Sequence, residues 1–212
     1  MRKMTTTSET ELGFSAAIPA RQSASGGTAR AAQPTDIDSL LMLQVAREDS
    51  ESALRTLIDK WKNPLVSFVY ASTRDFQLAE DIAITVFRKL YNARESYRAE
   101  AKFSTFLFRI AHNEIITEYR KRQARPAETD DIADIDLPAP SDSGAKLRDI
   151  EEAFAAAVDK IPSKQREAIT LLVRNELSYA EIADIMGESV ASVKTLVNRA
   201  RARLRESMKD YI

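Results

Sequence analysis

A proline- and aspartate-rich segment between two helical stretches constrains the fold of this chain more than any other feature. Residues 126–144 read PAETDDIADIDLPAPSDSG, with three prolines, five aspartates, one glycine and no basic residue. Proline and glycine interrupt regular structure, and a segment of like charges does not form a packed core. The segment therefore predicts a flexible acidic linker between two domains.

The stretch before this linker, residues 36–125, has apolar residues at helical spacing. In AEDIAITVFRKL they recur three or four positions apart, at Ala79, Ile82, Ala83, Val86, Phe87 and Leu90. Such a stripe is the buried side of an amphipathic helix. Asp36 or Asp38 is expected to cap an earlier helix, and Pro64 is expected either to kink a second helix or to begin a new one.

Residues 145–212 are helical again, and their last part predicts a helix-turn-helix. Ser178 and Glu181 have the spacing of a capping box, and Gly187 can adopt the left-handed turn of a short corner between helices. Ser189 or Ser192 is expected to begin the next helix. The predicted fold class is all-α, with two small helical domains, the second of them a helix-turn-helix domain.

Composition excludes several classes of function. The 212 residues have a net charge of −1 and no cysteine, so nucleic-acid binding must come from local patches, and disulfides and thiolate metal sites are excluded. With one histidine, His112, and no glycine-rich phosphate loop, we expect no catalytic, cofactor or metal site. Residues 1–35, rich in Ser, Thr, Ala and Gly, are expected to be a disordered tail. No apolar run could span a membrane or serve as a signal sequence, which favours the cytoplasm.

The last helix predicts a DNA-reading surface. Opposite its apolar stripe lie short polar groups and then cations: Ser192, Lys194, Thr195, Asn198, Arg199, Arg201, Arg203 and Arg205. Short polar side chains can reach base edges and cations can hold phosphates. A merely solvated basic helix is the alternative, but Glu206 is nearly the only acid that could compensate these charges.

The first domain contains a second basic surface. Aromatic residues and cations alternate in SYRAEAKFSTFLFR, and more cations follow at Arg120, Lys121, Arg122 and Arg125. Unpaired bases stack on aromatic rings while cations hold the backbone. The pattern favours single-stranded nucleic acid, although part of these aromatic residues is expected in the core.

Taken together, residues 38–210 resemble a bacterial RNA polymerase sigma factor of the extracytoplasmic-function (ECF) group. AEDIAITVFRKLY is similar to the polymerase-binding segment of sigma region 2, and KFSTFLFRIAHNEIITEYRKR to the segment that melts and reads the minus-ten element. The stretch from IPSKQREAITLL to ASVKTLVNRARARLR is similar to region 4, which reads the minus-thirty-five element. The resemblance implies a region 2 domain at 36–125 and a region 4 domain at 145–212. It further implies an alternative sigma factor whose partners are core RNA polymerase and promoter DNA.

The resemblance also assigns residues to each surface. Polymerase binding would involve Glu80, Asp81, Ile84, Thr85 and Arg88. The minus-ten element would meet Tyr97, Arg98, Lys102, Phe103, Ser104, Thr105, Arg109, Asn113, Arg120 and Arg122. The loop near Ser96 to Ser104 would capture one flipped base, helped by Phe103, Thr105, Arg109 and Asn113. The minus-thirty-five element would meet Ala191, Ser192, Lys194, Thr195, Asn198, Arg199, Arg201 and Arg203. Leu196 stands where the family often has a basic residue, and the aspartates of the linker would follow the positively charged cleft of the polymerase.

The polymerase-binding segment departs from the family pattern. Leu78 and Thr85 stand where the family has acids, and Ile84 stands where it has glutamine. Lost negative charge should weaken contact with a basic surface. A phosphate on Thr85 would restore about two negative charges, which makes a Ser/Thr kinase a candidate partner. The alternative is that burial of Ile84 against the polymerase compensates for the missing acids.

Other readings of the chain stay open. The resemblance makes an anti-sigma factor a further candidate partner, since the family is often held by one. A helix-turn-helix regulator that binds duplex DNA without polymerase would explain the last helices but not the aromatic and basic surface of the first domain. A decoy that occupies an anti-sigma factor would bind no DNA.

Overall fold

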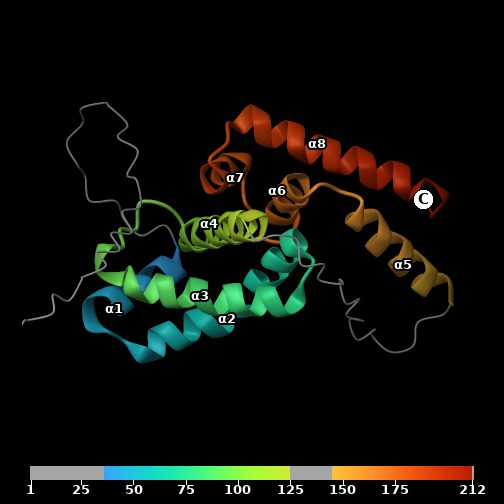
Figure 1. The fold of residues 1–212 in the computed structure, drawn as a ribbon. Helices are drawn as coiled ribbons and strands as arrows, with labels where there is room; N and C mark the ends of the chain where they lie inside the picture. Colours follow the sequence, from blue (N-terminus) through green and yellow to red (C-terminus); the bar gives the residue numbers. More distant parts are fainter. Residues whose placement is uncertain (1–35, 125–144, 212) are drawn as a thin grey trace, which may run out of the picture. The chain divides into compact units, whose positions relative to one another are not determined.

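The computed structural model describes residues 36–124 and 145–211, so the expected tail and linker lie outside the described residues. Every regular element in these two ranges is a helix, which confirms the all-α fold class (Figure 1). The first range holds α1 (Ile37–Glu48), α2 (Glu51–Thr73), α3 (Phe76–Asn92), a 3-10 turn (Arg94–Ser96) and α4 (Phe103–Ala124). The second holds α5 (Ala145–Asp159), α6 (Ser163–Val173), α7 (Tyr179–Met186), α8 (Val190–Ser207) and a 3-10 turn (Lys209–Tyr211).

Side-chain caps begin most of these helices. Asp36 accepts a hydrogen bond from the backbone N–H of Ser39 at 2.7 Å, and Asp75 accepts one from Leu78 at 2.9 Å. Such caps satisfy amides that have no partner inside the helix. Pro64 lies inside α2, which continues through it to Thr73, so the expectation of a new helix at this proline is wrong.

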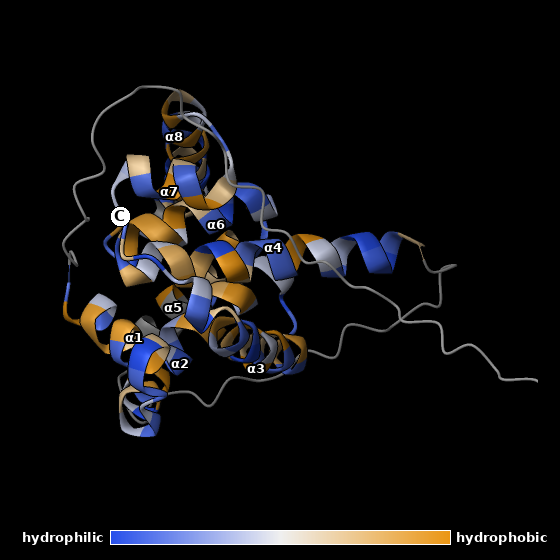
Figure 2. Cartoon of the chain, turned by 90° about the vertical axis from the view of Figure 1, so that its left-hand side faces the viewer, coloured by the Kyte–Doolittle hydropathy of each residue, from blue (hydrophilic) through white to orange (hydrophobic). Residues whose placement is uncertain are grey.

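The core of α1–α4 is built around aromatic rings. The Phe108 ring lies 5.2 Å from Phe68 and 5.9 Å from Trp61, in edge-on packing that aromatic pairs favour. On α3 the predicted stripe is confirmed, because all of its members are buried except Phe87, which is partly buried. Figure 2 shows apolar and polar positions sharing single helices, as expected for amphipathic elements.

The predicted helix-turn-helix is confirmed in α7 and α8. Ser178 and Glu181 form the reciprocal capping box, and Gly187 ends α7 with φ of 64°. Ser189 caps α8 by accepting a hydrogen bond from the N–H of Ser192 at 3.1 Å. Since Val193 and Val197 are buried, the opposite side of α8 is left exposed.

Among the described residues, helices of the α1–α4 group contact helices of the α5–α8 group. Helix α2 contacts α6, and α4 contacts α7. The sequence predicted two domains but did not indicate this contact. Its residues determine which parts of the candidate site are accessible.

Candidate functional site

The outward side of α3 carries the residues assigned to polymerase binding. Glu80, Asp81 and Arg88 are exposed, and Thr85 is half-buried. Ile84 is 68% exposed, the second most exposed large apolar residue in the described part of the chain. The fold does not bury this apolar side chain, which lies in solvent beside two carboxylates. Such exposure is typical of a surface that a partner covers.

The outward side of α8 is basic and accessible. The residues assigned to the minus-thirty-five element are exposed, apart from Ser192, which is half-buried. Leu196, where a basic residue was expected by resemblance, is half-buried and packs against the core. This side of α8 can therefore hold phosphates with its cations and approach base edges with its shorter residues.

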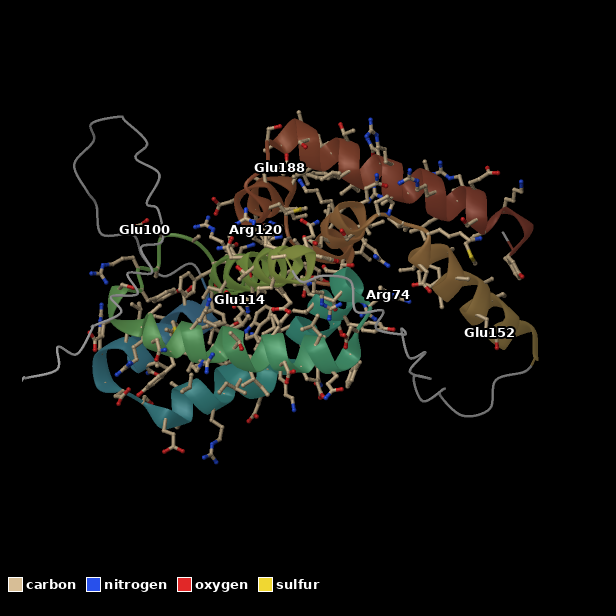
Figure 3. The ribbon with its side chains drawn as sticks, viewed as in Figure 1. Arg74, Glu100, Glu114, Arg120, Glu152 and Glu188 are labelled. Atoms are coloured by element: carbon tan, nitrogen blue, oxygen red, sulfur yellow. The ribbon has the colours of Figure 1, made fainter. Side chains whose placement is uncertain are left out.

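An acid that the sequence analysis did not single out lies at the start of this surface. Glu188, at the corner between α7 and α8 (Figure 3), accepts hydrogen bonds from the Ser192 hydroxyl at 2.9 Å and the Lys164 ammonium at 3.2 Å. These two bonds lower the pKa of Glu188 below its ordinary value. The carboxylate thus fixes Ser192 and partly neutralises the entrance to the basic surface.

The residues assigned to the minus-ten element divide into an accessible and a buried set. Accessible, fully or partly, are Arg98, Lys102, Arg109, Asn113, Arg120 and Arg122. Buried are Tyr97, Phe103, Ser104 and Thr105. The Phe103 ring packs 6.1 Å from Trp61 and the Tyr97 ring 5.1 Å from Phe106, so both rings belong to the core of this structure.

Two of the accessible cations are occupied by acids of α7. The Lys102 ammonium lies 2.9 Å from the Glu181 carboxylate, and Arg109 forms an ion pair with Asp184. The sequence places Glu181 and Asp184 three residues apart on α7, but only the packing of α7 on α4 reveals which cations they meet. The basic surface of α4 is therefore partly neutralised from within the chain.

His112 makes the corresponding contact with α6. Its Nδ1 lies 2.9 Å from Oε2 of Glu167, and both side chains are buried. The sequence interpretation of His112 as a satisfied helix residue agrees with this bond. In residues 36–124 and 145–211, no group of acidic or histidine side chains could hold a metal ion, and no helix is long and apolar enough to cross a membrane.

These features define an all-helical protein with a basic helix-turn-helix and a second basic surface on α4. Two family models match the chain: Sigma-70 region 2 over residues 57–125, and Sigma-70 region 4 over residues 151–204. The chain belongs to the ECF group of RNA polymerase sigma factors and is thus an alternative sigma factor.

Known relatives support this assignment over most of their own length. The chain is 32% identical to the ECF sigma factor SigM of Bacillus subtilis, covering 68% of this chain and 88% of the relative. It is 30% identical to the sigma-H factor of Pseudomonas aeruginosa, covering 82% and 95%. A solved complex of the sigma factor RpoE with the anti-sigma factor NepR from Bartonella quintana matches with a TM-score of 0.61 and 25% identity, covering 73% of this chain and 96% of that one.

Proposed function

We propose that this chain binds core RNA polymerase through α3, reads the minus-ten element with α4 and the loop before it, and reads the minus-thirty-five element with α8. In this proposal residues 36–125 act as the region 2 domain and 145–212 as the region 4 domain. Residues 126–144 act as the acidic linker. The chain acts in the cytoplasm as a transcription initiation factor without catalysis of its own.

The observation that carries the proposal is the exposed face of α8. A capped helix with cations along one side, held behind a glycine corner, is the geometry that a major-groove reader requires. A regulator acting without polymerase would share this face, but the exposure of Ile84 beside the carboxylates of Glu80 and Asp81 on α3 favours an additional protein partner. An anti-sigma factor is a further candidate partner, since the related RpoE is bound by one.

Control of polymerase binding at Thr85 is the finer part of the proposal. Thr85 is half-buried on α3, beside the exposed Ile84 and one turn after Glu80 and Asp81. A phosphate there would add negative charge to the acidic end of this surface and strengthen contact with a basic partner. Without a kinase, Ile84 would have to supply the missing contact by apolar burial.

The test is the affinity for core RNA polymerase of the wild type, Thr85→Glu and Thr85→Ala, measured at one moderate salt concentration. Tight and equal binding would support an ordinary sigma factor and contradict the kinase switch. Weak binding by the wild type and tight binding by Thr85→Glu would support the switch. If no form binds, the polymerase proposal fails.

The two alternative functions, a polymerase-independent regulator and a decoy for an anti-sigma factor, make opposite predictions for DNA binding. A polymerase-independent regulator would bind duplex DNA and lose affinity in the double variant Lys194→Ala, Arg199→Ala, yet open no promoter with polymerase. A decoy for an anti-sigma factor would be unaffected by the same substitutions. Transcription from a promoter library with core polymerase separates these cases from the proposed function.

A further inference from the structure

We infer that Glu188 is a specificity-determining residue of the minus-thirty-five surface. Together with Ser192 it forms a pair of hydrogen-bond acceptors that selects adenine or cytosine on one strand, because these two bases offer an amino group in the major groove. The inference rests on the proposed function of α8. It goes further by naming the chemistry that one position of the DNA element must have.

Two hydrogen bonds fix the Glu188 carboxylate at the corner between α7 and α8 (Figure 3). Its Oε2 accepts the Ser192 hydroxyl at 2.9 Å, and its Oε1 accepts the Lys164 ammonium at 3.2 Å. The two partners come from α8 and α6, which contact each other. Because each oxygen has a partner of its own, the carboxylate cannot turn without breaking a bond, and its side chain is only 27% exposed.

The bond to Glu188 decides what Ser192 offers to DNA. An ionised carboxylate only accepts hydrogen bonds, so the hydroxyl of Ser192 donates its single proton to Glu188. Hydrogen bonds from Ser192, and then from Lys164, hold the pKa of Glu188 below its ordinary value, so the carboxylate is ionised at neutral pH. The Ser192 oxygen is therefore left with lone pairs and no free proton.

Ser192 lies where a helix-turn-helix reads bases. It is the third residue of α8, and it is half-buried, so it stays partly accessible. In this motif the first residues of the second helix contact base edges in the major groove. The acceptor pair of Glu188 and Ser192 is thus placed at the end of α8 that approaches the bases.

Two acceptors at one place discriminate between bases. Adenine N6 and cytosine N4 are amino donors in the major groove, whereas guanine shows only acceptors and thymine an acceptor and a methyl group. An amino group can donate to the Ser192 oxygen or to a free lone pair of the Glu188 carboxylate. Guanine O6 or thymine O4 would instead meet like partial charges and lose its hydrogen bond to water, which rejects the wrong base.

The charge of Glu188 argues against a role in binding strength alone. It is the only acid in residues 187–205 and precedes five cations: Lys194, Arg199, Arg201, Arg203 and Arg205. An acid at this entrance repels phosphates and lowers affinity for every sequence alike. A structural role is the alternative, since an acid just before a helix stabilises the helix dipole. That role does not depend on the base, so a measurement of base preference separates the two.

The test uses the full chain with core polymerase and a promoter library whose minus-thirty-five element is randomised and whose transcripts carry barcodes. We expect the wild type to prefer adenine or cytosine over guanine and thymine at one position. Glu188→Gln gives Ser192 an amide N–H to accept from and frees its proton, and Ser192→Ala removes the hydroxyl. Both should reduce the preference at that position about two- to tenfold, the effect of one hydrogen bond. Ser192→Thr, which keeps a hydroxyl, should retain it.

A matched control separates base preference from charge. Glu152→Gln removes the same charge from an exposed position on α5 and should leave every base preference unchanged. If Glu188→Gln and Ser192→Ala change all sequences alike and keep the preference, the inference is overturned while the proposed function stands. If the wild type yields no transcript from any promoter, the proposed function fails and the inference with it. Circular dichroism checks folding, and either variant alone suffices if the other does not fold.

Discussion

Nδ1 of His112 on α4 lies 2.9 Å from Oε2 of Glu167 on α6, and neither residue is more than 5% exposed. The two residues are 55 positions apart and belong to different helical groups. A bond of this kind couples the stability of one group to the other. It also places the chain's single histidine where α4 contacts α6.

Loss of the bond between His112 and Glu167 should lower the stability of α1–α4, although Glu167 belongs to α6. Glu167→Ala leaves His112 buried without its partner, at an expected cost of about 1–3 kcal/mol. Trp61, the only tryptophan, lies among the aromatic rings of α1–α4, so its fluorescence in a urea titration reports that group. The midpoint should fall in Glu167→Ala but not in Glu152→Gln, which changes an exposed acid of α5. An unchanged midpoint in both would show that the groups unfold independently.

The corner between α7 and α8 should tolerate only residues that accept a left-handed backbone. Gly187 has φ of 64°, and a Cβ built there would meet nothing within 4 Å. Any cost of Gly187→Ala is therefore backbone strain and not a clash, about 1–2 kcal/mol. Gly187→Asn should cost less, because asparagine visits this region more readily. Thermal unfolding followed by circular dichroism compares the stability of the wild type and the two variants. If both variants lose the same stability, backbone strain at Gly187 is not the cause.

The basic face of α8 should show the salt dependence of phosphate contacts. If Arg201 holds one phosphate, Arg201→Ala should reduce the slope of log affinity against log salt by about 0.9 on duplex DNA. Arg55→Ala removes an exposed arginine from α2, where it pairs with Glu51, and should leave the slope unchanged. Fluorescence anisotropy at several salt concentrations gives both slopes. Equal slopes in the wild type and Arg201→Ala would remove Arg201 from the proposed interface.

Acid should weaken the capping box of α7. Burial acts to raise the pKa of Glu181, but hydrogen bonds from Ser178 and Lys102 outweigh it and hold the pKa below the ordinary value of 4.5. The carboxylate therefore stabilises the fold fully above about pH 4.5, and this contribution is lost as pH falls through the lowered pKa. Glu181→Gln should be less stable than the wild type at pH 7, and the difference should shrink toward pH 3. A constant difference in denaturation midpoints across this range would exclude the charged form as the stabilising one.

Local signals in the sequence predicted the helices and the helix-turn-helix because each depends on residues a few positions apart. The α3 stripe, the Ser178–Glu181 box and Gly187 are of this kind. At Pro64 the sequence left two outcomes open, a kinked helix or a new one, and only the structure shows that α2 continues through the proline.

Which residues of the candidate site are buried, and which are paired, depends on contacts between helices that the sequence does not indicate. Tyr97 and Phe103 fit a base-stacking pattern as well as a core pattern, and only the neighbouring rings of Phe106 and Trp61 place them in the core here. The partners of Lys102 and Arg109 come from α7, about 75 residues further along the chain. Their roles at the minus-ten element stay predictions.

Because His112 lies where α4 contacts α6, its NMR signal can report whether this contact is present. An untagged chain has one imidazole, whose carbon-bound protons resonate apart from the aliphatic signals in a proton NMR spectrum. Because that ring contacts Glu167 only while α4 and α6 are together, its resonance should move whenever a partner separates them. Binding of polymerase, DNA or another regulator could then be classified as opening or preserving the contact without attaching any label.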